Sequence, residues 1–169
     1  MKTTLNNIRA YGPCTSGWSK LLKNLGKTQT DDEPVSIITI LESNGLKDAL
    51  WCLRATTGYD RELRLYAVWC ARQVQHLMTD SRCLAAPDVA ERFAHGEATD
   101  QDLTAARTAV NDATGDAGWS AAWATVVATT WSAACVTPWA AMQAGVAETS
   151  LANELRRVCL VIEEQENIK

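Results

Sequence analysis

The sequence has few of the residues that favour β-strands. Phenylalanine occurs once and tyrosine three times, although tryptophan occurs seven times. Because aromatic and β-branched residues are the usual strand formers, and no long run of valine or isoleucine is present, this composition predicts a helical protein. A chain of 169 residues has the size of about one domain. It can bury roughly two thirds of the surface of its unfolded form.

Metal-binding patterns are also missing. The six cysteines form no CxxC or CxxH spacing, and the chain has only two histidines. A zinc site needs such ligands at short, repeated spacing, so we predict no metal and no cofactor. The first residues lack the apolar core and cleavage site of a secretory signal, which predicts a cytoplasmic location. In that reducing compartment we expect thiols and no disulfides.

Charged residues are absent between Asp116 and Glu148. This length would cross a bilayer, but it is rich in alanine, threonine and serine, which gain little from hydrocarbon. We therefore predict no membrane span and, instead, a central Ala/Trp-rich helix in a water-soluble bundle. Thr137 is expected to cap a second, shorter helix that starts at Pro138. Bulky residues recur every four positions and so wind around the helix, which must be covered on several sides.

Capping residues and apolar spacing predict about eight helices and no confident strand. Serine, threonine and aspartate cap first turns, and glycine often ends a helix. The run "SIITI" at 36–40 could form a strand, but it has no predicted partner, so we expect a helix. The predicted helix starts are Thr3 or Thr4, Thr15 or Ser16, Asp32, Asp60, Thr99 and Ser150. The predicted helix stops are Gly12, Gly26, Gly45, Gly115 and Gly118. A break or kink in a helix is expected at Pro87.

These signals together predict an all-α fold, a single-domain helical bundle that spans residues 1–169. Residues 1–30 carry five lysines and arginines and no acid, whereas residues 31–169 hold all 20 acidic residues. We expect this basic head to pack on the acidic remainder of the chain.

Two short stretches echo each other: "LWCLR" at 50–54 and "VWCAR" at 68–72. We expect both to lie on successive helices that form a hairpin around Gly58. Cys70 falls in an apolar stripe at helical spacing, and Cys52 follows a tryptophan, which predicts that both thiols are packing residues of the core. A thiol-dependent enzyme with His76 or His95 as the base stays open as an alternative.

The helix that follows Gly58 also presents a polar side. Arg61, Arg64 and Arg72 fall opposite the apolar stripe, so we expect this side to be exposed. The segment "YDRELR" at 59–64 forms a mixed-charge corner of a kind that can contact a partner. The candidate partner-binding residues are Asp60, Arg61, Glu62, Arg64, Arg72 and His76.

The segments "ALWCLR", "DRELRLYAVWCARQVQHL" and "AERFAHGEAT" resemble a family of phage and bacterial immunity proteins, also described as Imm-5-like. The likeness spans about residues 40–140, and "GWSKLLKNLGKTQTDD" resembles the phage-borne branch of that family. Relatives continue with alanine-rich repeats that carry aspartate and arginine, where this chain has serine and threonine. The resemblance implies an all-helical, non-catalytic protein that neutralises another protein, and it supplies no catalytic residues.

We therefore expect a phage or prophage protein that acts in the cytoplasm of the bacterial host by binding a protein. The partner would be a toxin, for an immunity protein, or a component of a host defence system such as a CRISPR complex. An acidic body can compete for surfaces that bind nucleic acid, which favours the second. A second copy of the chain is a further candidate partner.

A single-stranded nucleic-acid binder is the remaining alternative. The basic head would supply the charge and the tryptophans would supply stacking platforms. Five charges spread over 30 residues make only a weak patch. The sequence therefore disfavours nucleic acid as the partner.

Overall fold

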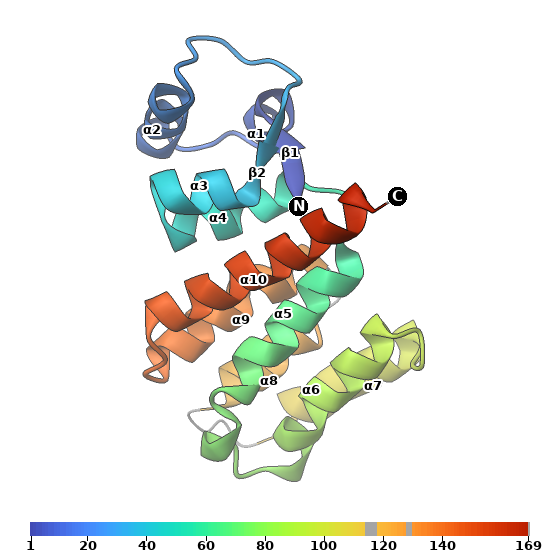
Figure 1. Cartoon of the computed structure of the whole chain (residues 1–169). Coiled ribbons are helices and arrows are strands. Elements are labelled where there is room, and N and C mark those ends of the chain that lie inside the picture. The colour runs from blue at the N-terminus through green and yellow to red at the C-terminus, as the bar shows by residue number, and fades with distance from the viewer. Residues whose placement is uncertain (114–117, 128–129, 169) are drawn as a thin grey trace. The chain divides into compact units, whose positions relative to one another are not determined.

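The computed structural model describes residues 1–113, 118–127 and 130–168. Within these residues the chain forms ten α-helices and one small two-stranded sheet, so the all-α class is confirmed, with more helices than the eight predicted (Figure 1). None of the described helices is long and apolar enough to cross a membrane.

The contacts divide the chain into two compact units. Unit 1 combines Met1–Tyr59 with Ala152–Lys169, and unit 2 consists of Asp60–Leu151. The basic head, residues 1–30, belongs to unit 1 together with residues 31–59. The single domain over residues 1–169 stays a prediction. The two Trp-Cys stretches also fall in different units, so the hairpin expected between them stays a prediction.

Unit 1 contains the sheet, which the sequence analysis did not predict. Strands β1 and β2 are antiparallel, with Lys2 opposite Ser36 and Thr4 opposite Pro34. The expected start of a helix at Asp32 is therefore wrong. Pro34 has no N–H to donate and occupies the first position of its strand, where proline is tolerated. The elements of unit 1 are β1 Lys2–Thr4, α1 Leu5–Ala10, α2 Thr15–Leu25, β2 Pro34–Ser36, α3 Ile37–Asn44, α4 Leu46–Cys52, the short 3-10 helix Leu53–Ala55, and most of α10 Glu148–Asn167.

Several predicted helix ends in unit 1 are confirmed. Thr4 caps α1, since its hydroxyl accepts a hydrogen bond from the amide of Asn7. Gly26 ends α2 with φ of 66°, a left-handed conformation that favours glycine. The "SIITI" run is helical from Ile37 onward, as expected, and Ser36 is its cap. The N-cap of α2 is Cys14 instead of Thr15 or Ser16.

Residues from both ends of the chain meet in unit 1. The Met1 amino nitrogen lies 3.5 Å from Glu163 Oε1, and the Ser36 hydroxyl donates to the same oxygen at 2.7 Å. The Tyr59 hydroxyl donates to Glu166 at 2.9 Å. Three residues of α10 are buried in this region: Leu155, Cys159 and Ile162. The carboxyl-terminal part of α10 is therefore an integral part of unit 1.

Unit 2 is built around α5, which packs against α6, α8 and α9, while α6 packs against α7. The predicted capping box at the start of α7 is confirmed, since the Thr99 and Asp102 side chains each accept from the other's amide. Helix α6 continues through Pro87. The predicted stop at Gly115 lies outside the described residues. The elements are α5 Asp60–Arg72, the 3-10 helix Gln75–Leu77, α6 Ser81–Ala94, α7 Asp100–Asn111, α8 Trp119–Thr125 and α9 Thr130–Gln143.

The uncharged stretch forms two helices, α8 and α9, but they divide at an earlier position than predicted. Helix α8 ends at Thr125, and α9 begins at Thr130 and runs through Pro138. The prediction that Thr137 caps a helix starting at Pro138 is therefore wrong. At the end of α8, the carbonyls of Thr125 and Val127 accept hydrogen bonds from the side chain of Arg64.

Thr137 is fully buried inside α9, and its hydroxyl makes no hydrogen bond with the described residues. A buried hydroxyl without a partner loses its hydrogen bonds to water and gains none in the protein, which destabilises the folded state. We expect Thr137→Val, which has the same shape, to raise the free energy of unfolding by about 1 kcal/mol. Urea unfolding measures this, with the solvated Thr104→Val on α7 as the control. A destabilised Thr137→Val variant would show that the hydroxyl is satisfied.

Candidate protein-binding surface

One of the predicted partner-binding residues, Arg64, is not on the surface. Its side chain is 1% exposed, and Nη1 donates to the backbone carbonyls of Thr125 at 2.9 Å and Val127 at 2.7 Å. The guanidinium also lies 5.5 Å from the centre of the Phe93 ring. Burial lowers the pKa of this group, and the negative charge of Asp60 partly offsets that effect. The expectation that Arg64 is exposed is therefore wrong, because its partners are carbonyls that only the tertiary fold brings near.

One side of α5 faces solvent and carries both charged and apolar side chains. Arg61, Leu65, Trp69 and Arg72 follow one another at helical spacing, so they share one side of the helix. Arg61 and Arg72 are exposed, whereas Leu65 and Trp69 are partly buried. This side contains both cations and half-exposed apolar groups.

Helix α6 contributes a matching row. Leu84, Asp88, Glu91 and His95 recur at three- and four-residue steps and are exposed or partly exposed. Helices α5 and α6 pack together, and contacts of Arg72 with Asp88 and Glu91 and of Arg61 with His95, the residue after α6, connect the two rows. We call the two rows together the α5–α6 surface, and it consists of Arg61, Leu65, Trp69, Arg72, Leu84, Asp88, Glu91 and His95.

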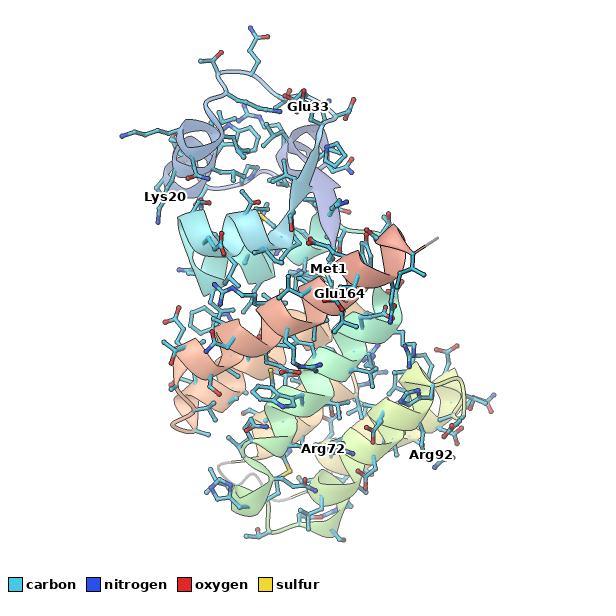
Figure 2. The ribbon with its side chains drawn as sticks, in the orientation of Figure 1. Met1, Lys20, Glu33, Arg72, Arg92 and Glu164 are labelled. Atoms are coloured by element: carbon cyan, nitrogen blue, oxygen red, sulfur yellow. The ribbon has the colours of Figure 1, made fainter. Side chains whose placement is uncertain are left out.

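Arg72, which is labelled in Figure 2, connects α5 to α6 at this surface. Its Nη2 lies 2.6 Å from Glu91 Oε2, and its Nη1 lies 3.1 Å from Glu91 Oε1, a bidentate pair. Nη2 also donates to Asp88 at 3.1 Å. The hydrogen bond to Arg72 lowers the pKa of Glu91, so this carboxylate stays charged well into the acid range. The arginine is thus held in one orientation by two carboxylates.

Arg61 makes a second, looser connection. Its Nη1 lies 3.4 Å from Glu62 Oε1, and its Nη2 lies 3.4 Å from His95 Nδ1. Asp60 is exposed at the first turn of α5, where the helix dipole favours a negative charge. His76 is exposed on the 3-10 helix after α5 and contacts none of these groups through a hydrogen bond or ion pair in the described residues.

The sequence analysis therefore identified part of the surface. It found Arg61 and Arg72 on α5. It did not assign the other members to a partner-binding surface: Leu65, Trp69, Leu84, Asp88, Glu91 and His95. The helical spacing of the α6 residues can be read from the sequence. That they face Arg72 can be seen only from the packing of α6 on α5.

The thiols that the enzyme alternative requires are buried. Cys52 is 5% exposed and Cys70 is not exposed at all, so neither lies in an open cleft beside His76. All six cysteines are thiols, and Cys14 is the one classed as exposed. The sequence-based expectation that Cys52 and Cys70 are core residues is confirmed.

Thiol accessibility gives a direct test of this assignment. Burial raises the pKa of Cys159 to about 11, whereas hydrogen bonds from Ser16 and from the Gly17 amide lower the pKa of Cys14. The thiolate is the reactive form, so iodoacetamide at neutral pH should modify Cys14 alone in the native protein. Peptide mapping by mass spectrometry identifies the adduct, and Cys14→Ser should abolish it. Earlier modification of Cys52 or Cys70 would instead support thiol chemistry.

The described residues hold no group of three or more histidine, cysteine, aspartate or glutamate side chains that could bind a metal ion. The chain matches no protein-family model, no curated protein and no solved structure.

Proposed function

We propose that this chain is a non-catalytic protein that acts by binding another protein through the α5–α6 surface. The observation that carries the proposal is the arrangement of Arg72, which two carboxylates hold in place beside the partly exposed Trp69. Arginine and tryptophan contribute most often to binding energy at protein interfaces.

The geometry favours association for a second reason. A free arginine loses much rotational entropy when it binds, whereas Arg72 is already held by Glu91 and Asp88. Rigid helices present the row, so a partner meets a defined pattern of positive and negative charges. Such a pattern selects partners and raises the rate of encounter more than it raises affinity.

The proposed biological role rests on the sequence resemblance. The likeness to phage-borne immunity proteins supports a phage or prophage protein that acts in the cytoplasm of the bacterial host and inhibits or neutralises its partner. That partner would be a toxin or a component of a host defence system such as CRISPR. The net charge of −4 suits a protein that competes for a basic surface.

Affinity capture from lysates of the host cell, followed by mass spectrometry, tests the proposal. We expect the wild-type chain to enrich a specific protein and Arg72→Glu to reduce its capture by at least about tenfold, because the change repels a partner carboxylate. The matched control is Arg157→Glu, which reverses another exposed arginine that is ion-paired with Glu154.

A further variant separates binding from stability. Arg72→Glu combined with Glu91→Arg restores an ion pair between α5 and α6 but reverses its polarity. We expect this double variant to fold as the wild type does and still fail to capture the partner. Equal capture by wild type, Arg72→Glu and Arg157→Glu, or enrichment of no protein, would contradict the proposal.

A further inference from the structure

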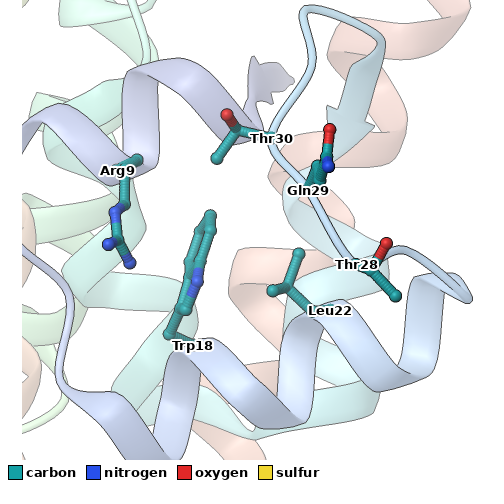
Figure 3. Close-up of a pocket in the computed structure, with 6 residues that line it drawn as sticks. All are labelled: Arg9, Trp18, Leu22, Thr28, Gln29 and Thr30. Atoms are coloured by element: carbon teal, nitrogen blue, oxygen red, sulfur yellow. The ribbon is translucent and has the colours of Figure 1, made fainter.

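A surface hollow in unit 1 lies outside the α5–α6 surface. It has a volume of about 390 Å³, within the range of small-ligand sites. Arg9 comes from α1, Trp18 and Leu22 come from α2, and the remaining lining residues come from the loop after α2 (Figure 3). Those loop residues are Thr28, Gln29 and Thr30.

The loop that forms one wall is held in place by contacts within the loop and by contacts with α1. Lys27 pairs with Asp31 and Glu33 and so closes the loop on itself. Asn6, on α1, donates from its backbone amide to the Asp31 carbonyl at 3.1 Å and from its side chain to Asp32 at 2.9 Å. The hollow is therefore preformed, which lowers the entropic cost of binding a ligand.

The polar side chains around the hollow make no ion pair and no hydrogen bond with the residues that the structure describes. The Arg9 guanidinium lies 5.5 Å from the centre of the Trp18 ring and makes no ion pair with a described residue. The side chains of Thr28, Gln29 and Thr30 make no hydrogen bonds within the described residues, so they are free to meet a ligand. The hollow thus offers one positive charge, neutral donors and acceptors, and an apolar wall.

We propose that this hollow binds an acidic peptide segment of a partner protein. Arg9 would bind one carboxylate, for which a guanidinium is geometrically suited. Trp18 and Leu22 would contact the apolar side chain of a neighbouring residue of the peptide. The side chains of Thr28, Gln29 and Thr30 would bind backbone amides, which each peptide unit supplies as one donor and one acceptor.

Charge distribution favours a peptide over a nucleic-acid strand. Arg9 is the one charged residue that lines the hollow, and the nearby Lys27 is neutralised by two carboxylates. Lys20 lies about 200° around α2 from Trp18 and so faces away. A strand with one phosphate per nucleotide needs a row of cations along its path, whereas one carboxylate needs a single arginine.

The inference goes beyond the proposed function and uses a different unit, so the two can fail separately. The probe is a blocked tetrapeptide of alternating leucine and glutamate, titrated into the full chain while the indole N–H signal of Trp18 is followed by NMR. We expect a saturable shift that Arg9→Gln weakens by about tenfold or more, as loss of a charge-assisted bond predicts. The matched control, Lys20→Gln, removes a charge from the far side of α2 and should change nothing.

Three further titrations decide the ligand class. The same peptide with glutamine in place of glutamate should bind at least about tenfold more weakly, because it lacks the carboxylate. Glutarate alone should produce no comparable shift, and equal binding of glutarate would overturn the peptide assignment. Tighter, salt-sensitive binding of a ten-residue oligothymidylate, or no shift with the acidic peptide at millimolar concentration, would also overturn the proposal.

Discussion

Replacing Arg64 by methionine is expected to destabilise unit 2 by about 3 kcal/mol, at roughly 1.5 kcal/mol for each of two lost charge-assisted hydrogen bonds. Methionine fills much of the same volume but cannot donate to the carbonyls of Thr125 and Val127. Both carbonyls accept a hydrogen bond from Arg64 at less than 3 Å, and they lie at the end of α8. Left without a donor in a buried site, they would favour opening of this region.

Native-state hydrogen exchange is the appropriate measurement, because it reports the stability of each unit separately. The amides of α5 and α9 should lose protection in Arg64→Met. The control is Arg61→Met, one turn earlier on the same helix and exposed, which should change stability by no more than about 0.5 kcal/mol. Similar losses for both variants would show that the buried hydrogen bonds contribute little.

Ending the chain after Leu151 is expected to unfold unit 1 and leave unit 2 folded. The truncation removes the buried Leu155, Cys159 and Ile162, together with the carboxylate of Glu163 that accepts from Ser36. Burial of a large apolar side chain contributes about 1.5–3 kcal/mol. Their combined loss is comparable to the roughly 5–15 kcal/mol that holds a domain together.

Hydrogen exchange also distinguishes the outcomes of this truncation. Amides of α3 and α4 should exchange at rates near those of an unfolded chain, while α5 and α9 keep their protection. A chain that ends at Asn167, which retains every contact named above, is the control and should match the full-length protein. Protection of α3 in the chain ending at Leu151 would mean that residues 1–59 fold without α10.

Local signals account for the features that the sequence predicted. Thr4 and the Thr99–Asp102 pair cap helices through hydrogen bonds to amides only three residues away. Gly26 ends its helix because its own backbone adopts a conformation that other residues resist. Such features depend on a few neighbouring residues, so a pattern in the sequence is sufficient to find them.

The missed features depend on contacts between distant parts of the chain. Residues of strand β2 pair with residues of β1 that lie 30 to 34 positions earlier in the sequence. A three-residue strand that begins at Pro34 has no distinctive pattern of its own. Arg64 occupies a polar position on α5 by helical spacing, yet carbonyls about sixty residues later bury it. The charge of Arg64 therefore predicted an exposed side chain, but tertiary packing buries it.

The candidate sites show the same division. Helical spacing in the sequence predicts that Arg61 and Arg72 lie on one side of α5. Which residues of α6 lie beside them depends on how the two helices pack. In the hollow, Trp18 and Leu22 share a face of α2 by their spacing, whereas Arg9 joins them only because α1 packs nearby. Charged and aromatic residues that could bind a partner can be recognised in a sequence. Which of them lie together can be seen only in the folded structure.

The division of the chain also sets an order of events during its synthesis on the ribosome. Residues 60–151 are made before α10 is complete, so unit 2 has all its residues while unit 1 still lacks Ala152–Lys169. Translation usually lets the amino-terminal part of a protein fold first. If the truncation result is as expected, the nascent amino-terminal segment stays unfolded until Ala152–Lys169 is made. Chaperones that bind unfolded segments would then have their longest opportunity to bind residues 1–59.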